Sequence, residues 1–471
     1  MLLCYVMNKY HNIKNSLLDN ILNIKNKKVK NTQTEQPIKL DPNDIPKYVN
    51  QLQKPPVYKP CITKKWSLFG KCKIQHSYTI DISEFEQQIL PPGLPKTKVW
   101  GYGGLIKDKK TGKVRYSRSA PGATFEAVRG VPINVKWINR LKGKHLFAVD
   151  PTLHWANPNN MPMHNIPKPW PPFPPGFKEA QFPVPIVTHL HGGENESVYD
   201  GYPEAWFTFN GKYGPDFKTT KYYYPNKQEA ATLWYHDHAL GITRLNVYAG
   251  LAGFYLLRDK ENNALEGKLC LPSGKYEIPL AIQDRMFNTN GSLLFNNVGN
   301  NPDIHPFWTP EFFGDTIMVN GRVWPNLNVD RHQYRFRILN GSNSRFYNLK
   351  MSNNMTLIQI GSDGGFLPKP VELTSLLIAP GERADILVDF SQVTPGTKIR
   401  LLNDANTPFP TGESPDPNTV GQIMQFTVPA DAHKYKKPKK LPDKLNDIPL
   451  LIPDVKRILT LVEVMEQDTP T

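Results

Sequence analysis

The chain has 471 residues and a formal net charge of +15, and this length allows two or three domains with full hydrophobic cores. Its 45 proline and 32 glycine residues lie between many short apolar runs, which argues against a helical protein and favours an all-β fold of sandwiches or barrels. No stretch approaches the roughly 20 apolar residues of a membrane helix, and no nucleic-acid-reading motif accompanies the charge. We therefore expect no membrane span and no nucleic-acid partner.

The N-terminal part of the chain is strongly basic, with 14 Lys against 4 Asp or Glu in residues 1–80. Residues 1–45 are predicted to form a basic, flexible extension. A solvated tail is the preferred interpretation, and an electrostatic anchor for an acidic partner is the alternative. The apolar residues 1–6 are too few for a signal-peptide core and follow no basic region, so classical secretion is not supported.

The four cysteines, Cys4, Cys61, Cys72 and Cys270, are widely scattered. No C-x-x-C spacing occurs, so a structural zinc site is not expected. Cys61 and Cys72 either form a disulfide or remain free thiols, and the sequence leaves both possibilities open.

Residues 46–260 are predicted to form a first β domain. Residues 124–139 give its clearest strand signal, because Ile133, Val135 and Trp137 alternate with polar residues and so share one face with the preceding valine. The predicted face is apolar, as expected for a strand that covers a core.

A second β domain is predicted over residues 270–430. It contains a strand-like run at residues 316–321 that ends in an Asn-Gly turn. A weak internal repeat aligns residues 127–139 with residues 328–340, and both segments end in Asn. Two related β domains in series would produce such a repeat.

Three further segments complete the predicted organisation. Residues 162–185 are a Pro-rich insertion in the first domain, expected to be a surface loop in an extended or polyproline conformation. Residues 431–455 are a Lys-rich linker. Residues 456–471 are strand-like and are interpreted as the start of a truncated third domain.

Two short motifs, THLHGG and WYHDH, each place a His-x-His pair in a strand-like run: His189 with His191, and His236 with His238. Residues i and i+2 of a strand point to the same face, so each pair offers two imidazoles on one surface. Imidazole suits copper, zinc, iron and nickel. Two such pairs within fifty residues favour a metal site over two accidental pairs.

The other histidines are interpreted as ordinary packed or exposed side chains; they are His11, His76, His145, His154, His164, His305, His332 and His433. A dinuclear zinc hydrolase would follow its H-x-H with D-H, and no such continuation follows His191. Asp237 lies between two predicted ligands but faces the opposite side of the strand, so a structural role is favoured for it.

At these residues the chain resembles the multicopper oxidases, specifically the branch of the spore-coat laccases and bilirubin oxidases. The resemblance runs in order from about residue 44 onward. The motifs that carry it are THLHGG at 188–193, DGYPEAWF at 200–207, LWYHDHALGITRLNVYAGLAGFY at 233–255, VNGRVWP at 319–325, YRFRILNGSNSRFYNL at 334–349, IQIGSDGGFLPKPVEL at 358–373 and APGERADILVDF at 379–390.

The resemblance implies tandem cupredoxin domains, each a Greek-key β-barrel, with two present here and a third truncated. It implies a type 1 copper that takes electrons from a small-molecule reductant, and a trinuclear cluster that reduces O2 to water. By position, His189 would bind the type 2 copper, and His191, His236 and His238 would bind the type 3 pair. Asp200 occupies the place of an acidic proton relay, with an Asp-Gly turn residue as the alternative.

The sequence departs from the family in one respect. The family's H-P-x-H-x-H run and H-C-H-x-x-x-H segment are both absent, and with them the type 1 ligands and half of the cluster histidines. We therefore expect only a half-site for type 2 and type 3 copper, and an inactive chain by itself. In its full-length form the protein is expected to oxidise a phenol, a tetrapyrrole or a metal ion with four-electron reduction of O2 to water. The alternatives are a non-catalytic structural or copper-binding coat protein and an oxidase completed by another chain. Localisation stays open between spore coat and cytoplasm.

Overall fold

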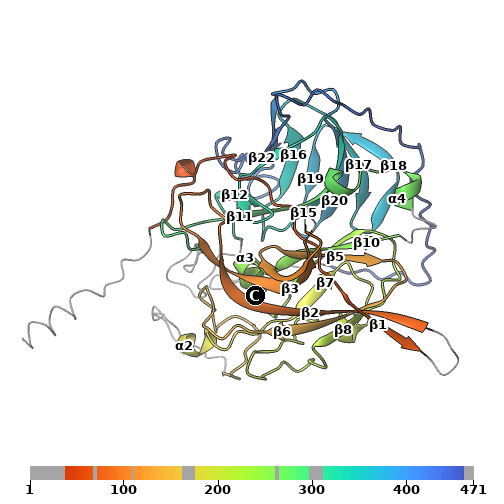
Figure 1. Cartoon of the computed structure of the whole chain (residues 1–471). Helices are drawn as coiled ribbons and strands as arrows, with labels where there is room; N and C mark the ends of the chain where they lie inside the picture. Colours follow the sequence, from red (N-terminus) through yellow and green to blue (C-terminus); the bar gives the residue numbers. More distant parts are fainter. Residues whose placement is uncertain are drawn as a thin grey trace, which may run out of the picture. The chain divides into compact units, whose positions relative to one another are not determined.

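The computed structural model describes residues 38–66, 72–108, 111–161, 176–259, 265–295 and 311–460. Strands dominate these ranges (Figure 1). The short helices are η1 (Pro42–Asp44), α2 (Phe177–Ala180), η2 (Ser197–Tyr199), α3 (Thr243–Ala249), α4 (Leu265–Lys268) and η4 (Gly274–Tyr276). None of the helices described here is long and apolar enough to cross a membrane.

The first half of the chain forms two sheets, drawn in orange to yellow-green in Figure 1. One has the order β4-β3-β2-β6-β8 with β1 on β2, and the other has the order β5-β10-β9-β7. The strands are β1 (Cys61–Trp66), β2 (Cys72–Gln87), β3 (Thr97–Lys107), β4 (Val114–Ser119), β5 (Gly122–Val128), β6 (Ile133–Asn139), β7 (Thr188–His191), β8 (Lys221–Tyr224), β9 (Thr232–Asp237) and β10 (Ala252–Arg258). Aromatic side chains from both sheets, including Phe125, Trp137 and Tyr235, pack into a shared core.

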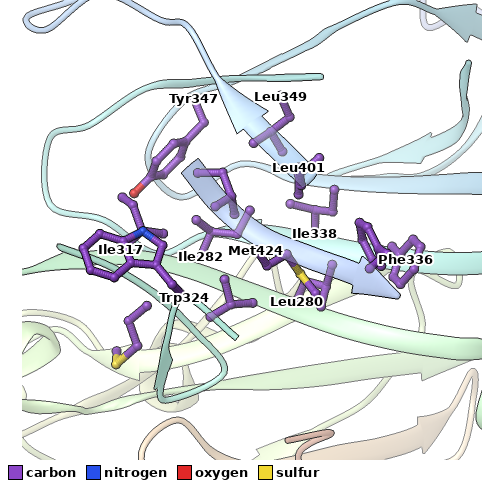
Figure 2. Packing of buried hydrophobic residues seen from close by; sticks show 14 of the residues in the cluster. Leu280, Ile282, Ile317, Trp324, Phe336, Ile338, Tyr347, Leu349, Leu401 and Met424 are labelled. Carbon is purple, nitrogen blue, oxygen red and sulfur yellow. The ribbon is translucent and has the colours of Figure 1, made fainter. Parts of the chain in front are cut away.

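The second half forms two more sheets, with the orders β13-β12-β11-β15-β20-β17-β18 and β14-β22-β21-β16-β19. The strands are β11 (Glu277–Arg285), β12 (Thr316–Val319), β13 (Arg322–Val323), β14 (Asn326–Asn328), β15 (Gln333–Asn340), β16 (Tyr347–Met351), β17 (Leu357–Ser362), β18 (Gly365–Leu373), β19 (Leu376–Ile378), β20 (Arg383–Asp389), β21 (Lys398–Asn403) and β22 (Gln422–Thr427). Figure 2 shows both sheets contributing to the core, with Leu280 and Ile338 from one and Leu349 and Met424 from the other.

The two halves share a core strand order, to which the second half adds β17, β18 and β19. β6 pairs in parallel with β2, and β15 pairs in parallel with β11. The asparagines that end the two repeated segments also make the same kind of hydrogen bonds. Asn139 Nδ2 donates to the carbonyls of Val184 and Phe207, at 3.0 and 3.1 Å. Asn340 Nδ2 donates in the same way to two carbonyls, at 2.8 and 3.1 Å.

The all-β prediction is confirmed, and the predicted Asn-Gly turn joins β12 to β13. Asn320 and Gly321 have φ values of 50° and 73°, as a two-residue hairpin turn requires. We propose domain boundaries of 46–260 and 270–430 on the basis of the two pairs of sheets. Residues 48 and 52, near the first boundary, donate backbone hydrogen bonds to the second pair of sheets, at 2.8 Å each.

Three local expectations need correction or fall outside the described residues. Residues 124–139 are not one continuous strand, because a turn that begins near Arg129 separates β5 from β6. Of the Pro-rich insertion, residues 162–175 lie outside the description, and α2 replaces the expected extended chain just after them. Residues 456–460 form no strand, and residues 461–471 are not described.

The β1–β2 hairpin places Cys61 opposite Ser77, and Cys72 opposite Trp66. The two cysteines therefore sit about 17 Å apart along the strands, at roughly 3.4 Å per residue. A disulfide requires Cα atoms within about 7 Å. Cys61 is a free, exposed thiol, which answers the question that the sequence left open.

Candidate metal centre

The four predicted ligands come together on the β7–β9 pair of strands. In this antiparallel pair His189 lies opposite His236, and His191 lies opposite Trp234. Thr188 and Leu190 point into the core, so the two histidines of β7 share the outward face. The imidazole centroids of His189 and His236 are 5.5 Å apart, and those of His189 and His238 are 5.1 Å apart.

Nitrogen atoms of three of these rings converge on one space. One ring nitrogen from each of His189, His191 and His236 lies within 4.8 Å of the others. His191 Nδ1 and His236 Nε2 are 3.2 Å apart, so at most one of these two nitrogens carries a proton. His238 contributes a buried Nδ1 that has no hydrogen-bond partner in the described part of the chain. This donor set is typical of a transition-metal site.

Backbone carbonyls hold the second nitrogen of two rings. His189 Nδ1 donates to the carbonyl oxygen of Asp200 at 2.5 Å. His236 Nδ1 donates to the carbonyl oxygen of Asp237 at 2.7 Å. Each bond fixes the tautomer in which Nε2 carries no proton, as metal-binding histidines generally require.

Burial favours the neutral form of three of these rings, those of His191, His236 and His238. Burial, together with the positive charge of Arg383, lowers the pKa of His191 to about 4. Burial also lowers the pKa of His238, and it lowers the pKa of His236 well below its ordinary value. Neutral imidazole is the form that binds a metal, so the rings are ready for one at neutral pH.

Trp234 and Arg383 support the cluster from two sides. The Trp234 ring lies 4.2 Å from the His236 ring and 5.0 Å from the His191 ring, both at 30°. Arg383 begins β20 in the second pair of sheets, and its Nε donates to the carbonyl of Thr232 on β9 at 3.0 Å. The first half of the chain carries the histidines, and the second half braces the strand that presents them.

Asp237 has the structural role expected of it. Its carboxylate accepts hydrogen bonds from the backbone N–H groups of Val187 and Ala239, at 3.0 Å each, and from Asn246 Nδ2 at 2.7 Å. Asn246 Oδ1 in turn accepts from His145 Nε2 at 2.9 Å. This buried chain ties the C-terminal end of the WYHDH motif to α3 and to the loop before β7.

Asp200 lies beside the cluster at the end of η2, and it is both a turn residue and a neighbour of a predicted ligand. Its carboxylate Oδ1 is 3.6 Å from His189 Nδ1, and its side chain is 37% exposed. Gly201 follows with φ 78°, and a Cβ there would meet the carbonyl oxygen of Thr188 at 2.2 Å. The Asp-Gly pair is therefore needed to bring the η2 loop against β7.

A cavity of about 460 Å³ opens next to three of the histidines, His191, His236 and His238. Its walls also come from α3, from Phe295 and Phe312, and from residues 341–344 of the second half of the chain. A small reactant has room to reach the ring nitrogens from this side.

Sequence reasoning found the four histidines and Asp200 but missed Arg383, Asn246 and His145 as supporting residues. Arg383 and Asn246 lie inside long quoted motifs, yet neither is a strong metal ligand. Arg383 donates a hydrogen bond to the carbonyl of Thr232, which lies 151 residues earlier in the sequence, so this contact is visible only in the folded structure. His145 was assigned to the ordinary packed histidines, and it is indeed buried and hydrogen-bonded.

Comparisons with known proteins identify the family of this chain. Sequence patterns described as Multicopper oxidase match residues 181–262 and 278–398. The chain is 40% identical over 404 residues to a laccase of Bacillus subtilis (strain 168), covering 84% of this chain and 69% of that protein. It is 43% identical over 383 residues to a laccase of Bacillus stratosphericus, covering 79% of this chain and 66% of that protein. The chain therefore belongs to the multicopper oxidase family.

One further relative and one solved structure add to this comparison. The multicopper oxidase LPR1 of Arabidopsis thaliana is 41% identical over 337 residues, covering 71% of this chain and 52% of that protein. A crystal structure of the McoA multicopper oxidase from Aquifex aeolicus superposes with a TM-score of 0.59 at 25% identity, covering 86% of this chain and 70% of the other. The two pairs of sheets are accordingly cupredoxin-like, and the chain spans only part of its relatives' length.

Proposed function

We propose that His189, His191, His236 and His238 hold copper in the oxygen-reducing centre of a laccase-like oxidase. Following the family motif, His189 would bind a type 2 copper and the other three a type 3 pair. The observation that carries the proposal is the convergence of imidazole nitrogens within 4.8 Å on two neighbouring strands. Family membership supports copper as the metal.

The residues present fit copper. The donors are imidazoles, backbone carbonyls fix the second nitrogens of His189 and His236, and His238 Nδ1 is buried without a partner among the described residues. When bound, copper accepts and passes on single electrons, which none of the side chains in this site does at neutral pH. The protein's own contribution is to hold the ligands and to exclude bulk water from them.

Asp200 is proposed as the proton carrier of the site. Its carboxylate lies 3.6 Å from His189 Nδ1 and is exposed enough to exchange protons with water. Reduction of O2 to water consumes protons, and a carboxylate at the edge of the cluster can deliver them from the solvent. In this proposal Trp234 and Arg383 keep His191 and His236 in position.

The remaining ligands are proposed to come from residues outside this sequence, which contains no adjacent His and Cys. They belong either to the same polypeptide or to a complementing chain. The reductant is proposed to be a small molecule or ion, namely a phenol, a tetrapyrrole or a reduced metal ion.

Oxygen uptake by the native protein tests the proposal. The protein is loaded with copper and supplied with an electron-rich phenol. One O2 should be consumed for every four electrons released, with no hydrogen peroxide. His191→Ala should abolish uptake, whereas His433→Ala, an exposed histidine outside the cluster, should not. Equal uptake by both variants would refute the proposal.

A second candidate function is copper binding without catalysis, as in a coat protein. The observation that favours it is that His189, His191 and His236 form the one group of potential metal ligands found in the described residues. Native protein that binds copper through these histidines but consumes no oxygen with a phenol, a tetrapyrrole or ferrous iron would establish this second function.

A further inference from the structure

A second, separate cavity of about 310 Å³ lies between β4 and the β12–β13 turn. The charged side chains that line it are Lys54, Arg115 and Arg322, and no acidic side chain is among its lining residues. Serine hydroxyls of Ser117 and Ser119 complete the polar wall. A concave site with three cations and no carboxylate favours an anionic ligand.

The alternation of β4 builds one wall of this cavity. Arg115, Ser117 and Ser119 are two residues apart in sequence and so project from the same face of the strand. The residue between the serines faces the other way: Arg118 Nη2 donates to Asp81 Oδ1 at 2.7 Å. Arg118 on one face of β4 is therefore paired with Asp81, whereas Arg115 on the other face gives the cavity wall a positive charge.

The Asn-Gly turn fixes the opposite wall. Asn320 Nδ2 donates to the carbonyls of Gln53 and Pro279, at 3.0 and 2.8 Å. A Cβ on Gly321 would lie 2.2 Å from the carbonyl oxygen of Ala120, so the turn packs directly against the end of β4. Arg322 follows immediately and enters the cavity from a rigid backbone.

The donors that line this cavity differ in their partners, and Lys54 Nζ already donates to the carbonyl oxygen of Gly274 at 2.7 Å. Within the described residues, the Arg322 guanidinium makes no hydrogen bond or ion pair, and neither do the hydroxyls of Ser117 and Ser119. Burial lowers the pKa of Arg322, and no carboxylate opposes that effect. Arg115 has only a long contact, 3.8 Å from Nε to Asp108 Oδ2. A half-buried guanidinium with no counter-ion is costly unless an anion pairs with it.

We propose that this cavity is a binding site for a phosphate-type oxyanion, held by Arg322 and Arg115 and by the hydroxyls of Ser117 and Ser119. Guanidinium groups bind phosphate oxygens by charge-assisted hydrogen bonds, and serine hydroxyls complete such sites. The cavity exceeds the size of inorganic phosphate, so free phosphate and a small phosphomonoester share the required chemistry. The proposal does not depend on copper or on oxidase activity.

Isothermal titration calorimetry of the copper-free protein tests this proposal, with inorganic phosphate and phenyl phosphate as probes against chloride at equal ionic strength. Both probes should bind, and Arg322→Gln should raise the dissociation constant at least about tenfold. Ser117→Ala should weaken binding by a smaller factor. Arg400→Gln removes the same charge from an exposed strand position elsewhere and should leave the affinity unchanged.

The two probes separate the possible ligands. Tighter binding of phenyl phosphate identifies a phosphomonoester, and equal or tighter binding of inorganic phosphate identifies the free anion. The proposal is overturned if neither probe binds, or if Arg322→Gln and Arg400→Gln weaken binding equally, since the effect would then be one of general charge.

Discussion

The two cupredoxin-like halves of this chain share a core strand order, but the outward faces of two corresponding strands, β7 and β16, carry different kinds of residue. In the first half, the outward positions of β7 carry His189 and His191. In the second half, β16 occupies the equivalent place, and its outward residues are Asn348 and Lys350, which bind Asp404. The inward residues of both strands are mostly apolar and buried. A few outward substitutions therefore decide whether such a barrel can hold a metal, while its core pattern is kept.

The largest expected effect comes from the glycine that brings the η2 loop against the first half's metal strand. Gly201→Ala would place a Cβ 2.2 Å from the carbonyl oxygen of Thr188, and φ 78° adds backbone strain. We expect the free energy of unfolding to fall by about 3 kcal/mol or more. Urea denaturation measures it. Gly211→Ala is the matched control, because its φ is 86° but no atom lies within 4 Å of the added Cβ.

Substituting either of the corresponding asparagines, Asn139 or Asn340, should lower the free energy of unfolding by a similar amount. Asn139→Ala removes a side chain that donates two hydrogen bonds and accepts one from Leu141 N–H at 2.9 Å. Asn340→Ala removes the same three, with the accepted bond coming from Ser342 N–H at 3.1 Å. Each should lower the unfolding free energy by about 2–4 kcal/mol, because buried groups are left unpaired. The exposed Asn418→Ala should change it little, and very unequal losses at the two sites would break the comparison.

A smaller effect, confined to the first half, concerns pH. Burial lowers the pKa of His145 to about 4, below its ordinary value of 6.5. The unfolded chain therefore binds a proton that the folded protein resists, and stability falls as pH drops from about 6.5 to about 4. The largest contribution is about 3 kcal/mol. His145→Gln should reduce the pH dependence of the unfolding free energy in this window without abolishing it, because burial also lowers the pKa of His191 to about 4. An unchanged slope would contradict the buried, neutral state of His145.

The smallest effect is expected on the outward face of the second half. Lys350 and Asp404 form an ion pair whose side chains are 40% and 42% exposed. Exposed pairs are worth roughly 0–1 kcal/mol. Lys350→Ala should therefore shift the urea midpoint very little. A large drop in the midpoint would mean that the outward face of β16 contributes to stability, contrary to this account.

The sequence allowed the all-β fold and the shared face of each His-x-His pair to be predicted, because both follow from period-two patterns in short runs, whereas the meeting of the two pairs depends on the pairing of β7 with β9. Ile133, Val135 and Trp137 lie buried along β6 as their alternation indicated. The turn before β6 was missed, since Val131 extends the apolar alternation into it. The bracing of β9 by Arg383 and the Asp237–Asn246–His145 chain could not be predicted, because they depend on contacts between segments far apart in sequence.

The central claim is that the histidines of β7 and β9 hold copper. The most direct test is a copper(II) titration of this chain followed by electron paramagnetic resonance. We predict a bound-copper signal with nitrogen hyperfine structure from imidazole, lost in the His191→Ala, His236→Ala double variant and kept in His433→Ala. A signal of the same shape and affinity in the double variant would contradict the account, because copper would then bind elsewhere.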